Sequence, residues 1–376
     1  MAIEVTAVRA PRDRDEFIRL PHRIYEADKL WVPPLEMDMR ARLDPKRNPF
    51  FLHGEAEPFL ARRDGVVVGR ITAQVCREHL RLHDDGAGFF GFFESIEDEA
   101  VARALFESAE SWLRERKMKV ARGPFNFTIN DEIGMLVDGF DTPPMVLMTH
   151  NPASYDGLVK AAGYEKVKDV FAWKYKVGEV PPRARRAHAE ITALPEVKVR
   201  PANLKDFDRE LRTILDIFND AWSDNWGFVP LTEPELEKAA KDLKMILDPE
   251  IALIAEIDGK PMAVSVAIPN LHEVIHDMGG KLFPFGIVKL LYRLKVQGVK
   301  SARLVMLGIR KELRGVKKYG GLSHMLYTEM NDRGQKRGYT HGELSWTLED
   351  NHPVNLGIKS MGGKVYKTYR IYEKKL

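Results

Sequence analysis

The sequence predicts an α+β fold that is built twice, because two successive stretches of the chain carry the same order of strands and helices. The length of 376 residues exceeds what one ordinary hydrophobic core needs and suits two domains. The halves also share identical residues at a constant offset. Three such pairs lie 200 residues apart: Asn151 and Asn351, Gly163 and Gly363, and Lys174 and Lys374. We therefore expect an internal duplication.

The first half alternates short strands with amphipathic helices. Asp64-Gly65 between two alternating apolar runs predicts a tight hairpin. The strongest helix prediction is 98–118, which begins with acidic residues, ends with basic ones and carries one apolar stripe. The stripe consists of Val101, Leu105, Ala109 and Leu113. The expected strands are 3–10, 56–63, 66–76, 87–95, 119–125 and 168–177, and the expected helices are 13–27, 98–118 and one that Asn151 leads.

The second half repeats this order after a connector. Residues 178–196 are Pro-rich and basic, so we expect a linker there between domains 1–177 and 197–376. Asp258-Gly259 predicts the second hairpin, within 249–271. The other expected strands are 197–202, 302–313, 341–348 and 366–374, and the expected helices are 206–222, 232–247, 321–338 and 352–362.

Composition excludes several classes of function. The net charge of +3 is far below that of a dedicated nucleic-acid binder, and the basic residues are not interleaved with aromatic stacking residues. Cys76 is the single cysteine, which excludes an internal disulfide and a multi-thiolate metal site. Its place in an alternating apolar run favours a buried small side chain over a nucleophile. No His/Asp/Glu cluster has the spacing of a metal site, so we expect no metal.

The chain carries no predicted targeting segment. Its N-terminus lacks an apolar stretch of signal-peptide length. No window reaches about 18 uninterrupted apolar residues, which a transmembrane helix would need. We therefore expect a cytoplasmic protein.

The second half resembles the GNAT superfamily of N-acyltransferases. The stretch "RLVMLGIRKELRG", 303–315, is similar to the GNAT central strand, and Asn351 with Gly362 eleven residues on is similar to the final GNAT motif. The whole chain looks like bacterial tandem GNAT proteins, a group that includes bacterial ceramide synthases. The resemblance implies two tandem GNAT folds, each a mixed, mostly antiparallel sheet flanked by helices. It also implies transfer of an acyl group from acetyl-CoA or a longer acyl-CoA to an amine.

The resemblance places acyl-CoA on the second half. The loop "RGVKKYGGLS", 314–323, precedes a helix, whose N-terminal amides and dipole favour a pyrophosphate. Lys317 and Lys318 would add positive charge. The loop is longer than the usual family form, so a plain helix-initiating turn with solvated lysines is the alternative. The expected CoA-binding residues are Leu307, Gly308, Ile309, Lys317, Lys318, Tyr319, Gly320, Gly321, Leu322, Ser323 and Asn351, and Asn351 is also expected to cap the last helix.

The first half lacks such a loop. Glu94, Glu97, Asp98 and Glu99 stand where phosphate would lie, and carboxylates repel phosphate. We expect this copy to serve as a scaffold or as a wall of the acceptor pocket, without a CoA site of its own.

Candidate catalytic groups lie on two strands. In GNAT folds a backbone N–H of the central strand faces the thioester, which implicates Leu307, Gly308 and Ile309, with Gly308 marking a possible bulge. Glu343 sits in the middle of a strand, so we expect it to act as base or ammonium binder; a solvent-facing or edge-paired Glu is the alternative. Ile358 occupies the position of the acid tyrosine of many GNAT enzymes. The thiolate would then leave as such or be protonated by water, and a catalytically inactive ligand-binding or structural protein remains the alternative function.

The acceptor side is predicted from aromatic residues. Trp222, Trp226 and Trp31 could form an apolar wall or belong to the core, and Ser345 shares a strand face with Glu343. The segment 281–297 interleaves apolar and basic residues. It fits contact with an anionic membrane surface, a cover over an apolar channel, or simple packing. The first two interpretations make a lipid-like amine acceptor and a long acyl chain plausible.

Overall fold

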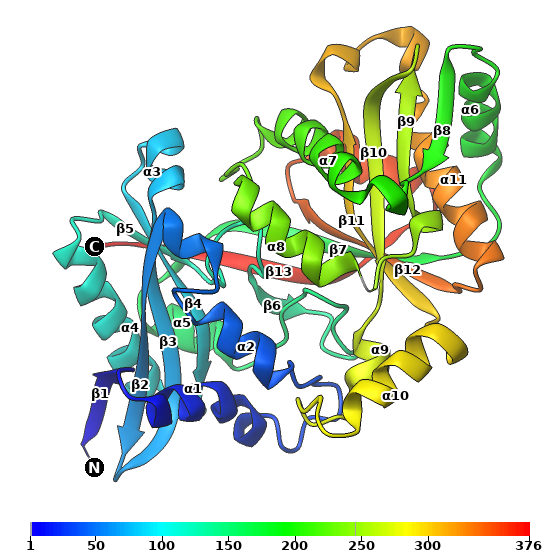
Figure 1. Ribbon diagram of the computed structural model, residues 1–376. Helices are drawn as coiled ribbons and strands as arrows, with labels where there is room; N and C mark the ends of the chain where they lie inside the picture. Colours follow the sequence, from blue (N-terminus) through cyan, green and yellow to red (C-terminus); the bar gives the residue numbers. More distant parts are fainter. Residues whose placement is uncertain (1, 245) are drawn as a thin grey trace. The chain divides into compact units, whose positions relative to one another are not determined.

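The chain forms two units that do not coincide with its two halves (Figure 1). The computed structural model describes residues 2–244 and 246–376. Unit 1 comprises Met1–Val170, Ile275–Ile287 and Lys367–Leu376, and unit 2 comprises Phe171–Val274 and Val288–Tyr366. The expected domain boundaries therefore differ from these units at the last strand of each half and at Ile275–Ile287.

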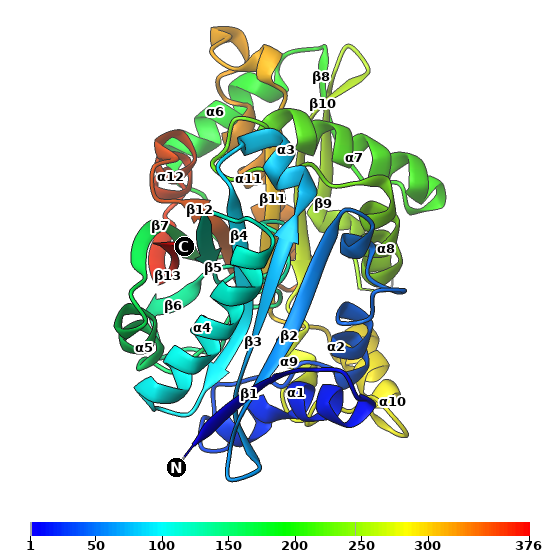
Figure 2. The same ribbon diagram turned by 90° about the vertical axis from the view of Figure 1, so that its left-hand side faces the viewer.

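Unit 1 is a mixed sheet flanked by helices (Figures 1 and 2). Its strand order is β1-β2-β3-β4-β5-β13, and β6 pairs with β13. All of these pairs are antiparallel except β4 with β5. The strands are β1 (Ile3–Ala7), β2 (Gly54–Arg63), β3 (Val66–Cys76), β4 (Ala87–Ser95), β5 (Val120–Gly123), β6 (Met135–Asp138) and β13 (Lys364–Lys375, in this unit from Lys367 on), and the helices are α1 (Pro11–Ile24), α2 (Glu36–Arg42), α3 (Arg77–His83), α4 (Glu99–Glu115) and α5 (Tyr155–Ala161), with a 3-10 turn at Pro49–Leu52.

Unit 2 repeats the plan with a longer set of connections. Its strand order is β7-β12-β11-β10-β9-β8, with β10 antiparallel to both neighbours and β11 parallel to β12. The strands are β7 (Glu165–Lys176, in this unit from Phe171 on), β8 (Val197–Pro201), β9 (Ala252–Ile257), β10 (Lys260–Pro269), β11 (Ser301–Ile309) and β12 (His341–Leu348), and the helices are α6 (Pro182–Thr192), α7 (Phe207–Trp222), α8 (Glu233–Lys244), α11 (Leu322–Lys336) and α12 (His352–Ser360). The helix expected over 232–247 passes through Met245, which lies outside the described residues.

Two short helices lie in the connection between β10 and β11. They are α9 (His272–Ile275) and α10 (Gly286–Tyr292), and a π-helical turn, Arg293–Gln297, follows α10. Neither helix was predicted as a separate element, because 281–297 was treated as one segment and no helix was predicted at His272–Ile275.

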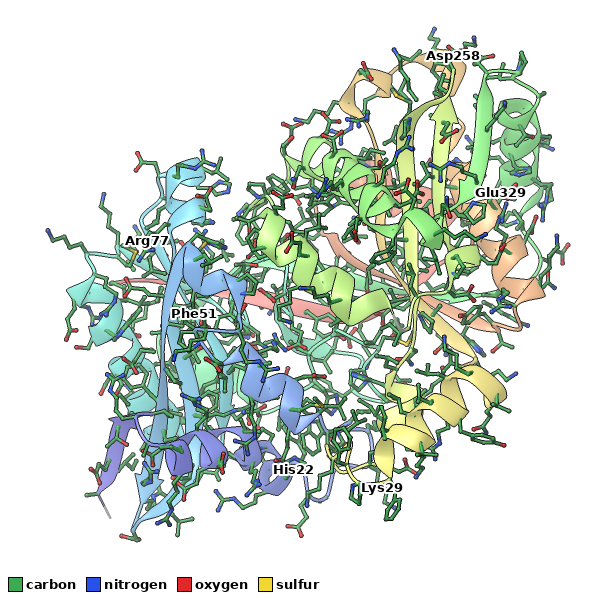
Figure 3. All side chains as sticks on the ribbon, viewed as in Figure 1. His22, Lys29, Phe51, Arg77, Asp258 and Glu329 are labelled. Atoms are coloured by element: carbon green, nitrogen blue, oxygen red, sulfur yellow. The ribbon has the colours of Figure 1, made fainter. Side chains whose placement is uncertain are left out.

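The local predictions follow from side-chain chemistry and hold well. Both hairpin turns use positive φ at both central residues, 52° and 76° at Asp64-Gly65 and 50° and 73° at Asp258-Gly259. This is the geometry of a type I′ turn, which Asp-Gly favours; Asp258 is labelled in Figure 3. The stripe on α4 packs against the sheet of unit 1, with every member at most 1% exposed. Cys76 is buried at 1% exposure, as the apolar run predicted.

The last strands of the two halves exchange units. β13 pairs antiparallel with β5 through Tyr372↔Gly123 to Lys375↔Val120, so the end of the second half completes unit 1. β7, the end of the first half, neighbours β12 in unit 2. The two strands have similar alternating patterns, and alternation does not specify which of two equivalent strands a segment will pair with.

The predicted linker is largely a helix. α6 begins with Pro182 at its first position, where proline is tolerated. Residues 178–181 and 193–196 alone match the expected irregular connector. The sequence prediction gave too much weight to proline as a loop signal and too little to its preference for helix starts.

Candidate functional site

The two parallel strands β11 and β12 pair over only four residues and then separate. Their register covers residues 301–304 of β11. Residues 306–309 continue to pair with β10 on one edge. Within the described chain no strand pairs with their other edge. The sheet of unit 2 is therefore open beside the second half of β11.

A bulge lies where this opening starts. In the register with β10, Val266 faces Met306 but Ala267 faces Leu304, so Val305 is the extra residue. A bulge bends its strand and ends regular pairing. The expected position of the bulge, Gly308, is wrong, because Gly308 pairs regularly with β10.

Gly308 instead makes room for an aromatic ring from α7. A Cβ at this position would lie 2.3 Å from Cζ3 of Trp222 and 3.1 Å from Cβ of Ala221. Trp222 in turn packs on Phe218, with ring centroids 4.8 Å apart. The glycine is needed for close approach, and half-buried Trp222 forms a wall directly over β11.

Two backbone amides of β11 face the opening. The Arg310 N–H donates to the Met262 carbonyl of β10 at 2.9 Å. Because N–H directions alternate along an antiparallel strand, the N–H of Gly308 points towards β10 as well. The N–H groups of Leu307 and Ile309 then point to the unpaired edge. Of the three residues predicted from the sequence, these two have amides in the right direction for a ligand.

The N-terminus of α11 is the second part of the site. Gly321 is the N-cap residue and makes no side-chain capping hydrogen bond, so no side chain of its own satisfies the first-turn amides. Gly320 and Gly321 have φ of −61° and −88°, so neither uses the left-handed conformations open to glycine. A Cβ on Gly321 would lie 2.6 Å from Cγ1 of Ile191, which makes this glycine a packing site for α6. Of these two glycines, only Gly320 has free space beside its Cα that a ligand could occupy.

The other expected residues of this loop divide between core and surface. Leu322 is buried with Met325 and Leu326 in the core of unit 2. Ser323 is half-buried in the first turn of α11, and Lys317 is exposed. Lys318 pairs with Glu196 at 2.5 Å and is 55% exposed, and the Tyr319 hydroxyl donates to the same carboxylate at 3.4 Å. A surface pair of this kind is weak, so it can open for a phosphate.

Cations nearer to β11 are paired with acidic residues of α7 and of the loop that follows it. Arg310 pairs with Asp216. Lys311 donates its backbone N–H to Asp220 at 2.8 Å and its ammonium to Asp224 at 2.6 Å. These contacts hold the start of the loop, at Arg310 and Lys311, against α7. The second part of the loop, 317–323, carries Lys317 and Lys318 and lies beside the N-terminus of α11.

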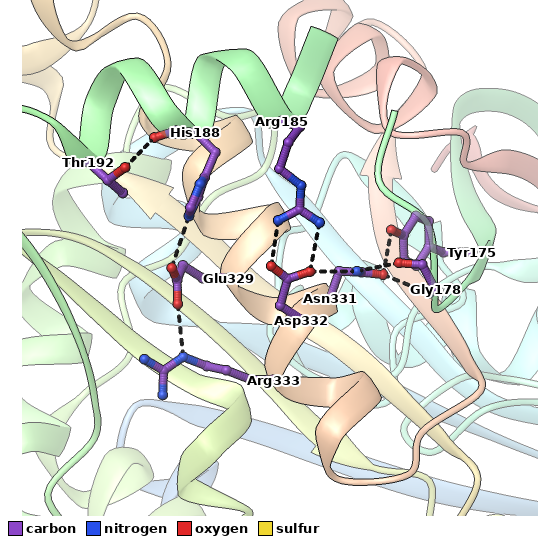
Figure 4. A network of polar contacts seen from close by, with 9 residues as sticks. All are labelled: Tyr175, Gly178, Arg185, His188, Thr192, Glu329, Asn331, Asp332 and Arg333. Atoms are coloured by element: carbon purple, nitrogen blue, oxygen red, sulfur yellow. Dashed lines mark hydrogen bonds and ion pairs between the residues drawn. The ribbon is translucent and has the colours of Figure 1, made fainter. Parts of the chain in front are cut away.

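Helix α6 is fastened to α11 by a polar network (Figure 4). Arg185 donates two hydrogen bonds to the carboxylate of Asp332, at 2.5 and 3.0 Å, and this guanidinium lowers the pKa of Asp332. One helical turn on, His188 contacts Glu329 at 2.9 Å. The network aligns α6 along α11 and holds Ile191 beside Gly321, so α6 supports the N-terminus of α11.

Glu343 is the centre of a buried hydrogen-bond network on the α7-facing side of the sheet. It is 2% exposed, so the solvent-facing alternative is wrong. One carboxylate oxygen accepts from the Ser345 hydroxyl and the other from the Tyr366 hydroxyl. Arg303 lies 3.6 Å from the first oxygen and donates its Nε–H to Ser345 at 2.7 Å. A buried carboxylate with a cation and two hydroxyl donors is chemically satisfied.

Sequence reasoning missed Arg303 and assigned Tyr366 only to a strand. Tyr366 does lie in β13, as expected, and so does fully buried Tyr369. The signal for Arg303 was present, since it is a charged residue inside an apolar strand, which was the argument used for Glu343. The register pairs Arg303 with Glu343 directly.

Apolar side chains line the opposite face of the opening. Leu304, Leu307, Leu344, Tyr327 and Ile358 belong to one cluster. Ile358 is 2% exposed, so the position of the family's acid tyrosine holds a core side chain. A cavity of about 60 Å³ lies beside Leu304 and Leu344 under α11. Asn351 caps α12 through the Val354 N–H at 3.4 Å, as predicted.

The remaining predicted tryptophans lie in different surroundings. Trp226 is half-buried in the loop after α7. Trp31 belongs to unit 1, where it stacks on Tyr25 with ring centroids 4.9 Å apart and contacts His22 edge-on at 5.1 Å.

The matching region of unit 1 is closed by its own chain. β4 and β5 also pair in parallel over only three residues, from Ala87 to Phe89. Beyond them, the Asn126 side chain accepts the Phe92 N–H at 2.8 Å, and the Phe125 N–H donates to Phe90 at 2.8 Å. A Cβ on Gly91 would lie 1.9 Å from the Phe125 carbonyl oxygen. Residues 125 and 126 thus fill the gap that stays open in unit 2.

The helix N-terminus of unit 1 is also occupied. The Asp98 carboxylate accepts the N–H groups of Ala100 and Val101 at 2.8 and 3.3 Å, and it pairs with Arg63 at 2.6 Å. Glu94 is buried and accepts hydrogen bonds from the hydroxyls of Tyr25 and Tyr155; burial raises its pKa. An anion would find the amides of α4 capped and carboxylates nearby.

Comparison with known proteins places these features in a family. No family model matches the chain. The chain is 43% identical over 377 residues to a protein of Caulobacter vibrioides named bacterial ceramide synthase, which covers 100% of this chain and 98% of that protein. The chain belongs to the family of this ceramide synthase. It is also 36% identical over 366 residues to protein YghO of Escherichia coli, covering 97% and 93% of the two chains.

Solved structures show that the family has the tandem GNAT fold. A tandem GNAT protein from the clavulanic acid biosynthesis pathway matches with a TM-score of 0.58 at 12% identity, covering 100% of this chain and 98% of that one. A GCN5-related N-acetyltransferase from Sphaerobacter thermophilus matches with a TM-score of 0.53 at 14% identity, covering 99% and 95%. The expected fold class is confirmed.

The arrangement in unit 2 fits an acyl-CoA. Three features support this fit: a helix N-terminus without a side-chain cap, basic residues beside it, and an unpaired strand edge towards which backbone N–H groups point. Among residues 2–244 and 246–376, no group of three or more His, Cys, Asp or Glu residues could hold a metal ion. None of the described helices is long and apolar enough to span a bilayer.

Proposed function

We propose that this tandem GNAT protein is an N-acyltransferase that moves an acyl group from acyl-CoA to an amine, with unit 2 as the catalytic unit. The observation that carries the proposal is the separation of β11 from β12 after residue 304, next to the uncapped N-terminus of α11. Unit 1, whose matching gap is filled and whose matching helix is capped by Asp98, serves as a unit without its own CoA site.

The residues around the opening supply the electrostatics of the reaction. A C–N bond forms, the thioester C–S bond breaks, the amine loses a proton and the sulfur leaves as thiolate. The N–H groups of Leu307 and Ile309 are placed to stabilise negative charge on the thioester oxygen. With Ile358 in the acid position, the thiolate leaves as such or takes a proton from water.

Glu343 is the proposed acceptor of the amine's proton. Its Ser345 neighbour accepts from Arg303 and donates to the carboxylate. The Ser345 hydroxyl can therefore pass a proton to Glu343 and take one from the ammonium. Arg303 lies 3.6 Å from the carboxylate and donates to Ser345, so it helps to position the serine hydroxyl against Glu343.

A long acyl chain and a lipid-like amine, such as a sphingoid base, are the finer form of this proposal. Support comes from the relative named bacterial ceramide synthase, which aligns over the full chain. The apolar cluster of Leu304, Leu307 and Leu344 and the adjacent cavity of about 60 Å³ give a long chain an apolar surface to follow.

Titration calorimetry with CoA and with acyl-CoA of increasing chain length tests the binding step. Ser323→Asp adds a carboxylate to the first turn of α11, imitating the carboxylate of Asp98 in unit 1, and Ser323→Asn is the uncharged control of the same shape. We expect the Asp variant to fold at least as stably, since an acidic residue favours a helix N-terminus, but to bind CoA on the order of tenfold more weakly than the Asn variant. Equal affinities of the two variants would remove the α11 N-terminus from the site.

An inactive ligand-binding protein is the second candidate. The apolar Ile358 and the fully paired Glu343 favour it. Mass spectrometry after incubation with acyl-CoA and a panel of short and long-chain amines separates the two. An amide product that is lost in Glu343→Gln supports the enzyme, whereas binding without any product in the whole panel supports the second candidate.

A further inference from the structure

The connection between β10 and β11 is far longer than its counterpart in unit 1. It spans residues 270–300, whereas the matching connection between β3 and β4 in unit 1 spans only 77–86. The additional residues include α10 and the π-helical turn after it, yellow in Figure 1. An addition of this kind needs its own physical explanation.

The segment 281–297 exposes large apolar side chains in unusual density. The exposed fractions are 67% for Phe283, 81% for Phe285, 65% for Val288, 58% for Tyr292 and 70% for Val296. Residues 288, 292 and 296 recur at helical spacing on one face. Leu290, at 8% exposure, lies on another face and packs inward. The helix is thus apolar towards the protein and apolar towards the outside, and exposed patches of this kind mark interaction sites.

The same segment is uniformly basic. Residues 281–297 contain four Lys and Arg and no Asp or Glu. The whole chain has 58 basic and 55 acidic residues, so this stretch accounts for more than the net charge of +3. Arg293 ties the segment to α9 through the Val274 carbonyl at 2.6 Å, and Lys281, Lys289 and Lys295 are exposed beside the apolar side chains.

We propose that the 281–297 segment binds the surface of an anionic lipid bilayer, with Phe283, Phe285 and Val288 inserted among the acyl chains and the lysines on the headgroups. Aromatic and aliphatic side chains next to lysines form the pattern of a helix that lies in the interface. A second copy of this chain fits less well, because a two-fold contact would place the basic segment against itself. The lipid surface would also deliver the lipid-like substrate of the proposed function, but binding to lipid does not depend on that function.

Vesicle co-sedimentation of the full chain tests the proposal. Vesicles of phosphatidylcholine alone are compared with vesicles containing phosphatidylglycerol, at low and high salt. We expect binding to the anionic vesicles that salt weakens. Lys281→Gln, Lys289→Gln and Lys295→Gln together lower the partition coefficient on the order of a hundredfold. Phe285→Ser with Val288→Ser lowers it more than tenfold.

The matched control is Leu52→Ser, which removes an apolar side chain that is 69% exposed elsewhere on the surface. It should leave vesicle binding unchanged. No binding to anionic vesicles, equal binding to both vesicle types, or an equal loss in Leu52→Ser each overturns the proposal. A wild-type dimer in sedimentation velocity that Phe285→Ser dissociates, without vesicle binding, assigns the surface to a second copy. Acyl transfer to a short soluble amine without vesicles is measured in parallel, so failure of lipid binding and failure of catalysis are distinguishable.

Discussion

The contact between Gly308 and Trp222 gives the sharpest test of the architecture around the opening. Gly308→Ala places a Cβ 2.3 and 2.9 Å from Cζ3 and Cη2 of Trp222, against 3.4–4 Å for ordinary contact. The ring or the strand must therefore move by about 1 Å, and overpacking of this size costs about 1–3 kcal/mol. The loss should appear as a lower midpoint in chemical denaturation. Because the ring lies over the strand whose amides are proposed to bind the thioester, acyl transfer should fall as well.

A double-mutant cycle separates this clash from any general effect of alanine. In the Trp222→Ala background the obstructing ring is gone and only the 3.1 Å contact with Cβ of Ala221 remains, so Gly308→Ala should then cost much less, and the cycle should show a coupling of about 1–3 kcal/mol. Gly342→Ala in β12 is the control, since its Cβ meets neighbours only at 3.7–4.0 Å, and it should be neutral or stabilising by up to ~1 kcal/mol. A wild-type midpoint for Gly308→Ala, or a cycle without coupling, would refute the described packing.

Three further variants probe the site, the support helix and the closed unit. Glu343→Gln should lower kcat on the order of 10²–10⁴-fold while the calorimetric Kd for CoA stays unchanged, because the loss is of a proton acceptor; a Kd that rises in step with the rate loss would contradict this role. Asp332→Asn should cost about 0.2–1 kcal/mol at pH 7. The pKa of Asp332 is lowered by Arg185, so the stabilisation from this ion pair is present above the unfolded pKa of about 4 and is lost as pH falls through the folded value. The melting temperatures of wild type and Asp332→Asn should therefore converge between pH 7 and pH 3. A difference in melting temperature that stays constant with pH would argue against the ion pair. Asp98→Ala should lower the melting temperature through loss of a helix cap worth about 1 kcal/mol, with Asp98→Asn near wild type, and equal losses in both would show that the charge pair with Arg63 matters more than the cap.

The candidate site was predictable where one residue's own chemistry decided its place. A carboxylate in the middle of a strand had to be buried with partners, and Glu343 is. An Asn before an apolar helix had to cap it, and Asn351 does. The bulge predicted at Gly308 lies at Val305 instead, because a glycine in a strand indicates either a bulge or a close approach, and only the neighbouring Trp222 distinguishes them.

The sequence alone determined the type and order of most elements, since side-chain alternation, helical stripes and Asp-Gly turns are properties of neighbours along the chain; α6, predicted as a linker, and α9 are exceptions. It also determined that two similar units exist and that the second carries the family motif. Only the tertiary structure decided which last strand completes which unit, where β11 leaves β12, and that unit 1 fills its own gap with residues 125 and 126. These outcomes depend on competition between segments far apart in sequence, and no local pattern records which of them wins.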